Sequence, residues 1–216
     1  MSDANSPPAP PQRGSARSIS REDLANLPIR RYEGEVRLVT TPEDLARARE
    51  DILRERVVGF DTETRPAFRV GESYAPCLFQ AATARTVYLF RFERREAFPL
   101  LAELLAEPRV VKAGVSTADD LRALRALFPF GERSVVDLGI VARQCGFAQT
   151  GLRNLAAIFF GYRIPKGTKT SNWAAPRLTA AQIAYAAMDA WACRELFLCF
   201  EQRGLLRPQR PQGSED

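Results

Sequence analysis

Residues 57–62 have the sequence VVGFDT, in which an apolar run of strand length is followed by Asp61 and Thr62. On a strand, alternate residues project from the same face, so Asp61 and Glu63 would lie about 6–7 Å apart on one side of the sheet. Two carboxylates at the end of a central strand repel each other unless a cation lies between them. An acidic pair at the start of a loop explains the pattern equally well. The segment therefore predicts a central strand and leaves the role of its acids open.

Strands and helices alternate on both sides of this segment. The pattern at 77–83 and 86–91 predicts two strands joined by a tight turn, and the strand-then-helix order elsewhere predicts a mixed sheet with helices on both faces, an α/β fold. The other expected strands are 35–40, 109–115 and 134–136, and the expected helices are 42–54, 95–106, 117–128, 138–145, 151–160 and 179–203.

The folded body is expected to cover residues 32–206. Residues 1–31 are rich in Pro, Ser and Arg at their start and predict a disordered tail. Within it, Ser20 followed by Asp23 three residues later could begin one short helix. Residues 207–216 again predict a tail.

The 216 residues include no histidine, which excludes imidazole bases and histidine-ligated metal sites. Acid–base or metal chemistry must then use carboxylates, tyrosine, lysine or thiols. The four cysteines form no CxxC pair, and free thiols among apolar neighbours are typical of a reducing compartment. We find no apolar stretch long enough for a membrane span and no secretory signal, so we expect a cytoplasmic protein without membrane contact.

Positive charge is concentrated in one part of the chain. The net charge is +5, and the segment 109–177 holds eleven Lys and Arg residues against four Asp and Glu. Such a segment is compatible with a polyanionic partner such as nucleic acid, although a solvated basic face would look the same.

Two further places hold acids where they are unexpected. Asp119 and Asp120 fall in the first turn of a predicted helix, where Thr117 and Asp120 fit a capping box. From 178 to 193 the only charged residue is Asp189, in the middle of an apolar helix, and Tyr185 lies four residues earlier on the same helix face. A buried Tyr–Asp hydrogen bond and a metal ligand are both open readings of Asp189.

The acids near residues 61, 120 and 189 are best explained by a single shared site. They could converge at one end of the sheet, and four carboxylates without histidine favour Mg²⁺ or Mn²⁺ over zinc. Two such ions about 4 Å apart would suit phosphoryl chemistry. The candidate metal ligands are Asp61, Glu63, Asp120 and Asp189.

The segments FDTET, KAGVSTADDL and YAAMDA resemble, in order and spacing, the three motifs of the DEDD exonuclease superfamily. A tyrosine four residues before the final Asp is similar to the tyrosine subgroup, the branch of ribonuclease D and the Werner exonuclease. The resemblance covers about residues 34–203. It implies a ribonuclease H-like fold and a 3′→5′ exonuclease that uses two Mg²⁺ or Mn²⁺ ions and releases 5′-mononucleotides.

The resemblance also implies a role for each motif residue. Asp61 would bridge both ions, Glu63 and Asp189 would complete the tighter site, and Asp120 would support the second ion. Tyr185, together with Glu63, would hold the attacking water in line with the scissile phosphate.

The segment PKGTKTSNW resembles the loop before the last family motif. Lys166 and Lys169 would then contact substrate phosphates, while Trp173 could stack on a base or serve as a core aromatic. The expected partner is nucleic acid with a single-stranded or recessed 3′ end, DNA or RNA. Because the resemblance includes no accessory domain, a protein partner could supply specificity, and a binding module with little catalysis is the alternative.

Overall fold

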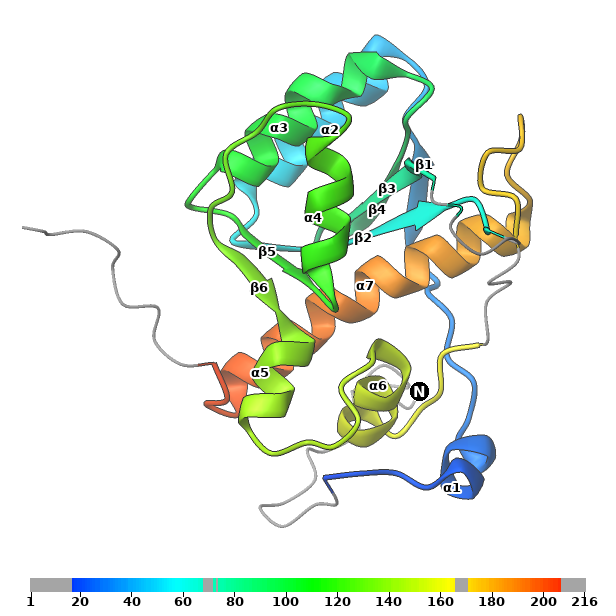
Figure 1. The fold of residues 1–216 in the computed structure, drawn as a ribbon, viewed down its shortest axis with the longest axis vertical. Helices are drawn as coiled ribbons and strands as arrows, with labels where there is room; N and C mark the ends of the chain where they lie inside the picture. The colour runs from blue at the N-terminus through cyan, green and yellow to red at the C-terminus, as the bar shows by residue number, and fades with distance from the viewer. Residues whose placement is uncertain (1–16, 68–71, 73, 166–170, 207–216) are drawn as a thin grey trace, which may run out of the picture.

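A computed structural model describes residues 17–67, 72, 74–165 and 171–206 as a six-stranded sheet flanked by helices (Figure 1). The strands are β1 (Glu35–Leu38), β2 (Val57–Thr64), β3 (Pro76–Ala82), β4 (Thr86–Arg91), β5 (Val111–Gly114) and β6 (Val135–Asp137). The helices are α1 (Arg21–Asn26), α2 (Pro42–Arg54), α3 (Phe98–Ala106), α4 (Thr117–Arg125), α5 (Leu138–Gln144), α6 (Leu152–Phe160) and α7 (Ala180–Gln202), and a short 3-10 turn, η1 (Arg95–Ala97), precedes α3.

The sheet is mixed, and β2 lies inside it. The strand order is β1-β4-β3-β2-β5-β6. Strands β2, β3 and β4 form an antiparallel meander, whereas β1 pairs with β4, β5 with β2 and β6 with β5 in parallel. The predicted hairpin of β3 and β4 and the predicted central position of β2 are confirmed.

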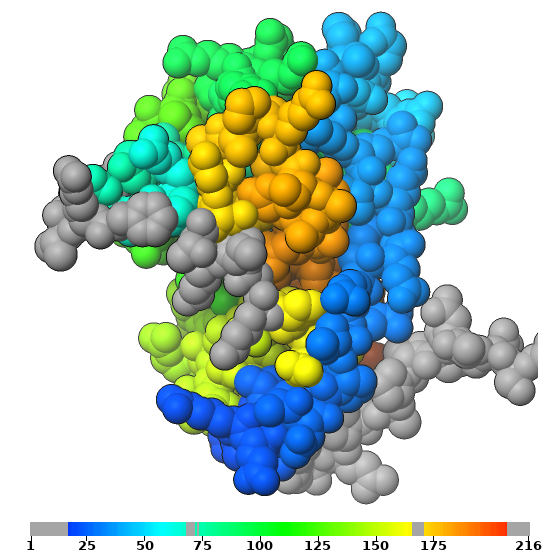
Figure 2. All heavy atoms as spheres, turned by 90° about the vertical axis from the view of Figure 1, so that its right-hand side faces the viewer, coloured from blue at the N-terminus to red at the C-terminus, as the bar shows by residue number. Residues whose placement is uncertain are grey.

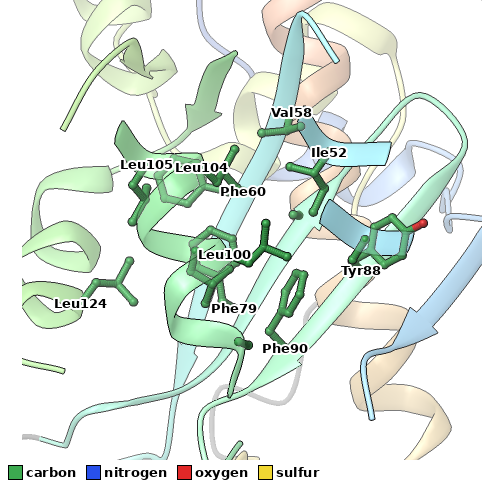
Figure 3. Close-up of a cluster of buried hydrophobic side chains, with 14 of the residues drawn as sticks. Ile52, Val58, Phe60, Phe79, Tyr88, Phe90, Leu100, Leu104, Leu105 and Leu124 are labelled. Atoms are coloured by element: carbon green, nitrogen blue, oxygen red, sulfur yellow. The ribbon is translucent and has the colours of Figure 1, made fainter. Parts of the chain in front are cut away.

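Helices cover both faces of the sheet, as predicted. On one face, an aromatic layer that includes Phe60, Phe79 and Phe90 packs against leucines of α3 and against Ile52 of α2 (Figure 3). On the other face α7 crosses the strands diagonally (Figure 1), and its alanines pack on Leu78 and neighbouring apolar residues. Alternation along each strand therefore sends one set of side chains to α2 and α3 and the other set to α7.

Side chains fix where the two best-defined helices begin. The Thr41 hydroxyl accepts a hydrogen bond from the Asp44 N–H, and the Asp44 carboxylate accepts one from the Thr41 N–H, which is a capping box. Thr179 and Gln182 form the same box at the start of α7. Both helix starts match the positions expected from the sequence.

The start of α4 differs from the prediction. The helix is preceded by Ser116, whose φ of 62° places it in the left-handed region. The Ser116 side chain does not cap the helix. The Thr117 N–H donates instead to the Asp137 carboxylate at 2.9 Å, so the predicted Thr117–Asp120 capping box is wrong. A left-handed residue between β5 and α4 turns the chain sharply and leaves Asp120 available for other contacts.

Residues 17–31, which the sequence analysis assigned to the N-terminal tail, include several residues that contact the body of the domain. The Ile19 backbone exchanges hydrogen bonds with the Gln149 side chain, at 2.8 and 3.0 Å. Arg163 donates its N–H to the Pro28 carbonyl and accepts one from the Arg30 N–H. Figure 2 shows this segment in blue beside the yellow-green chain of α6. The expected short helix forms as α1, with Ser20 as its N-cap.

None of the helices in the described part of the chain is both long and apolar enough to cross a lipid bilayer.

Candidate metal-ion centre and active site

Three carboxylates converge where the second half of β2 meets α7. Ligand oxygens of Asp61, Glu63 and Asp189 all lie within 4.8 Å of one another. Asp61 and Glu63 alternate along β2 and so project toward α7, as the strand period predicts. Asp189 reaches them from the middle of α7, where it is 5% exposed. Residues more than 120 positions apart in the sequence thus form one acidic cluster.

Gly59 permits this close approach of helix and strand. A Cβ atom at Gly59 would lie 2.0 Å from the Ala190 carbonyl oxygen and 2.6 Å from the Arg194 nitrogen. Any larger residue would push α7 away from β2 at a point two residues before Asp61 and one residue after Asp189. The glycine therefore sets the separation across which the carboxylates face each other.

Asp120 lies beside this cluster and is held by Thr62, which lies between Asp61 and Glu63 on β2. Its carboxylate accepts a hydrogen bond from the Thr62 hydroxyl at 2.6 Å. It lies close enough to Asp61 and Glu63 to raise the pKa of both carboxyls by repulsion. The adjacent Asp119 instead faces solvent in an ion pair with Arg122. The structure thus brings Asp120, not Asp119, to the site, and Thr62 is a supporting residue that sequence reasoning missed.

Burial raises the pKa of every carboxyl in the cluster, and repulsion by the other acids of the site raises the pKa of Asp61 and Glu63 further. Desolvation is the largest cause at each residue. The pKa of Glu63 rises to about 8, with further repulsion from Asp189 and Asp120, and that of Asp120 to about 6 against the opposing Thr62 hydrogen bond. The pKa of Asp189 rises to about 7, and that of Asp61 lies well above its ordinary range because the carboxyl is buried and the charges of Asp189, Asp120 and Glu63 repel it. A bound divalent cation would relieve such crowding of acids.

The donor set fits a hard cation. Every candidate ligand is a carboxylate oxygen, which suits Mg²⁺ or Mn²⁺, and no imidazole exists anywhere in the sequence to favour zinc. The oxygens of Asp61, Glu63 and Asp189 lie close enough together for one ion to bind all three.

Tyr185 stands one helical turn before Asp189 and lines the same cleft as Glu63. Burial, followed by the Asp189 charge, raises the pKa of Tyr185, so its hydroxyl keeps its proton and donates to Asp189. The cleft has a volume of about 510 Å³, and Arg65 and Tyr74 form part of its wall, with the guanidinium 3.9 Å from the ring centroid. Figure 2 shows the chain after β2 in cyan near the yellow and orange chain that leads into α7.

Trp173 is buried, whereas a residue that stacks on a base needs an exposed ring face. It is 2% exposed, and its ring centroid lies 6.1 Å from that of Tyr185. Because almost no ring surface remains free, the base-stacking reading is corrected to the core reading, in which Trp173 supports Tyr185 from behind. Lys166 and Lys169, the expected phosphate contacts, fall outside the described residues.

Arg153 is a second residue that sequence reasoning missed. It follows the first residue of α6, its Nε donates to the Ile164 carbonyl, and its charge lowers the pKa of Asp189. The arginine sits in the basic segment but is otherwise unremarkable in sequence, so only its tertiary position links it to the site.

The shifted carboxyls predict an unusual pH dependence of stability in the metal-free protein. Because the folded state binds more protons than the unfolded state between the ordinary carboxyl pKa and about 8, stability should fall as pH rises through this window. One proton of difference corresponds to ~3–5 °C of Tm per pH unit in a domain of this size. The measurement is Tm in chelator from pH 5 to pH 8, where no histidine contributes.

Excess Mn²⁺ should flatten or reverse this dependence, since cation binding requires the deprotonated carboxylates. Glu63→Gln should reduce the slope in chelator. A metal-free Tm that rises steadily from pH 5 to pH 8 would contradict the assignment of raised pKa values.

Comparison with known proteins shows the family to which this chain belongs. A family model described as 3′–5′ exonuclease matches residues 36–204. This chain belongs to that family. The carboxylates on β2, α4 and α7, with the tyrosine one turn before the last of them, identify it as a DEDD member.

Relatives and solved structures agree with this membership. The ribonuclease D of Gluconacetobacter diazotrophicus is 34% identical over 170 residues, which cover 77% of this chain and 42% of the relative. The EXO domain of Aedes aegypti Nibbler matches with a TM-score of 0.71 at 23% identity, over 81% of this chain and 90% of that one. Escherichia coli RNase D matches with a TM-score of 0.67 at 23% identity, over 80% of this chain and 47% of that one.

These structural matches establish the ribonuclease H-like fold of the exonuclease domain. The domain spans less than half the length of the ribonuclease D relative, so the activity of that whole protein is a separate question.

Proposed function

We propose that this domain is a metal-dependent 3′→5′ exonuclease that hydrolyses phosphodiester bonds at 3′ ends of nucleic acid and releases 5′-mononucleotides. The observation that carries the proposal is the buried carboxylate cluster of Asp61, Glu63 and Asp189, with Asp120 beside it. Family membership supports the reaction class. The chemistry of the donor set supports two Mg²⁺ or Mn²⁺ ions as the cofactor.

When bound, two divalent ions would stabilise the oxygen of the attacking water and the leaving oxygen of the phosphodiester. Asp61 would be shared between them, Glu63 and Asp189 would complete one site, and Asp120 would complete the other while the Thr62 hydroxyl fixes its carboxylate. Gly59 holds α7 at the distance that lets Asp189 and Asp61 act together.

Glu63 and Tyr185 would orient the attacking water, since both line the cleft beside the carboxylates. The Tyr185 hydroxyl, which donates its hydrogen bond to Asp189, can accept a hydrogen bond from the water, and the Glu63 carboxylate can accept the proton that the water loses. The water oxygen would then bond to phosphorus as the bond from phosphorus to O3′ breaks, and O3′ would take a proton from solvent water as it leaves. Trp173 limits the movement of the Tyr185 ring by packing against it.

The substrate would enter the cleft with its 3′ end toward the acids. Arg65 at the cleft wall offers a cation to a backbone phosphate, and we propose Lys166 and Lys169 for the same task. A protein partner could supply substrate choice. We place the domain in the cytoplasm, which the four free cysteines support.

A labelled-substrate assay tests the proposal. Single-stranded DNA and RNA oligonucleotides with a 5′ label are incubated with wild type and with Asp189→Ala, in Mg²⁺, Mn²⁺ or chelator. A ladder that shortens from the 3′ end, requires metal and is absent in the variant would support it. Intact substrate that is still bound by the protein would instead favour the non-catalytic binding module.

Tyr185→Phe should slow the reaction without ejecting metal. The substitution keeps the ring that packs on Trp173 and removes only the hydroxyl, so kcat should fall ~10–100-fold as one water-orienting group is lost. Mn²⁺ should still bind, as measured by calorimetry, with an affinity reduced by no more than ~10–100-fold, because Tyr185 hydrogen-bonds the proposed ligand Asp189 but is not itself a ligand.

Tyr162→Phe provides the matched control. The Tyr162 hydroxyl is buried and has no hydrogen-bond partner among the described residues, in a cluster on the other side of α7. Its removal should leave kcat unchanged. Equal kcat values for wild type and Tyr185→Phe would refute the role given to the hydroxyl.

A further inference from the structure

Gln80 on β3 is a buried polar side chain that the proposed mechanism does not use. It is 0% exposed, and neither its Oε1 nor its Nε2 has a hydrogen-bond partner in the described part of the chain. A buried amide without partners is costly, and native structures rarely keep one without a reason. Gln80 therefore calls for a role that justifies its burial.

The strand register places Gln80 beside the acidic cluster. It is directly opposite Asp61 in the antiparallel pairing of β2 and β3. Directly opposite residues point to the same face with Cβ atoms about 5 Å apart. The flanking Leu78 and Ala82 pack against alanines of α7 on that face, so the Gln80 amide lies in the layer between the sheet and α7. This is also the layer that holds Asp189.

The Asp61 carboxylate lacks a side-chain hydrogen-bond donor in the described part of the chain, and Gln80 could supply one. Among the described residues the Asp61 carboxylate accepts a hydrogen bond from the Thr62 backbone N–H and none from a side chain. Carboxylates that bind metal ions are usually themselves held in place by hydrogen-bond donors. Opposite Asp61 lies an amide with two unused N–H groups.

We propose that Gln80 is a positioning residue for the metal site, which itself rests on the function proposed above. When divalent cations bind, the Gln80 Nε2 donates to the Asp61 carboxylate, directly or through one buried water. The amide does not touch substrate, because its whole surface is covered by protein. It acts by holding the Asp61 carboxylate in one orientation.

Mn²⁺ binding to wild type, Gln80→Met and Leu89→Met tests this role. Methionine keeps the length of glutamine and removes its polar atoms. Leu89 is fully buried and directly opposite Gln80 on β4, so Leu89→Met makes a similar change in the same layer, one strand further from the acids. Calorimetry should show Mn²⁺ affinity ~10–100-fold weaker in Gln80→Met and near wild type in Leu89→Met, as expected for loss of a group that orients a ligand.

Metal-free stability separates positioning from a purely structural role. The Tm of Gln80→Met in chelator should equal or exceed that of wild type, because an unpartnered amide contributes nothing to the metal-free fold. A large drop in that Tm, or failure of both Gln80→Met and Gln80→Leu to fold while Leu89→Met folds, would overturn the proposal. In NMR spectra, the side-chain NH₂ signals of Gln80 are identified as those missing from Gln80→Met. In the wild type these signals should shift when Mg²⁺ is added.

Two further outcomes distinguish this inference from the proposed function. If wild type binds Mn²⁺ and Gln80→Met binds it within twofold of the same affinity, the inference is wrong and the metal site stands. If wild type binds no Mn²⁺ at all, the metal site fails and the inference fails with it.

Discussion

Replacing Asp61 by asparagine should abolish catalysis and at the same time make the metal-free protein more stable. Asp61 is the carboxyl around which the other three acids gather, and burial and repulsion by Asp189, Asp120 and Glu63 all disfavour its charge. Asparagine keeps the shape and removes the charge. Activity should fall ~1000-fold or more, because a metal site supplies several kcal/mol and each ~1.4 kcal/mol is a factor of ten in rate.

The gain in stability should be measurable at pH 8 in chelator. Relief of an unpaired buried charge is worth ~1–3 kcal/mol, which corresponds to a rise in Tm on the order of 5 °C for a domain of this size. Stabilisation by Mn²⁺ should disappear in Asp61→Asn, because ligand binding raises Tm only when the folded state binds the ligand. Thermal unfolding with and without Mn²⁺ measures both effects.

Asp119→Asn is the control for this experiment. Asp119 is a neighbour of Asp120 in sequence, but its side chain is 82% exposed and paired with Arg122. Its substitution should leave rate, Tm and Mn²⁺ binding close to wild type. Comparable losses of activity in Asp119→Asn and Asp61→Asn would contradict the site, and so would a fall in metal-free Tm for Asp61→Asn.

Gly59→Ala should have the largest effect on stability of any single methyl added to this protein near the site. The new Cβ would meet the Ala190 carbonyl oxygen and the Arg194 backbone of α7, neither of which can rotate away. Overpacking against backbone costs ~3 kcal/mol or more, so Tm should fall by about 10 °C. Whatever fraction stays folded must separate α7 from β2 and move Asp189 away from Asp61.

The prediction therefore includes function as well as stability. At a temperature where Gly59→Ala is still folded, its Mn²⁺ affinity should fall at least tenfold, since the ligands on β2 and α7 no longer share one centre. Gly151→Ala is the matched control, because a Cβ there would meet no atom within 4 Å. Wild-type Mn²⁺ affinity in Gly59→Ala would show that the contact does not set the position of Asp189.

Local periodicity predicted much of the site correctly. The strand period placed Asp61 and Glu63 on one face, and the helix period placed Tyr185 and Asp189 one turn apart, and both relations hold in the structure. These relations depend on neighbours within four residues, whose geometry the backbone fixes. The same reasoning failed at Thr117 and Asp120, because the Asp137 carboxylate from another part of the chain accepts the N–H that local capping would have used.

Contacts between distant segments decided the remainder. The Thr62 hydrogen bond to Asp120, the burial of Trp173 behind Tyr185 and the position of Gln80 opposite Asp61 have no local signal. Each depends on which strands become neighbours and which face a helix covers. Sequence spacing alone carries no information about either.

The sequence by itself determined the chemistry available to this protein. Without histidine, and with acids at the end of a strand and in the middle of an apolar helix, a metal centre built at these positions had to use carboxylate oxygens. Only the tertiary structure decided that these oxygens lie within 4.8 Å of one another, because that distance is set by the backbone contact between Gly59 and Ala190. The same contact makes the site buried and mutually repulsive, and that electrostatic cost is what a bound cation would remove.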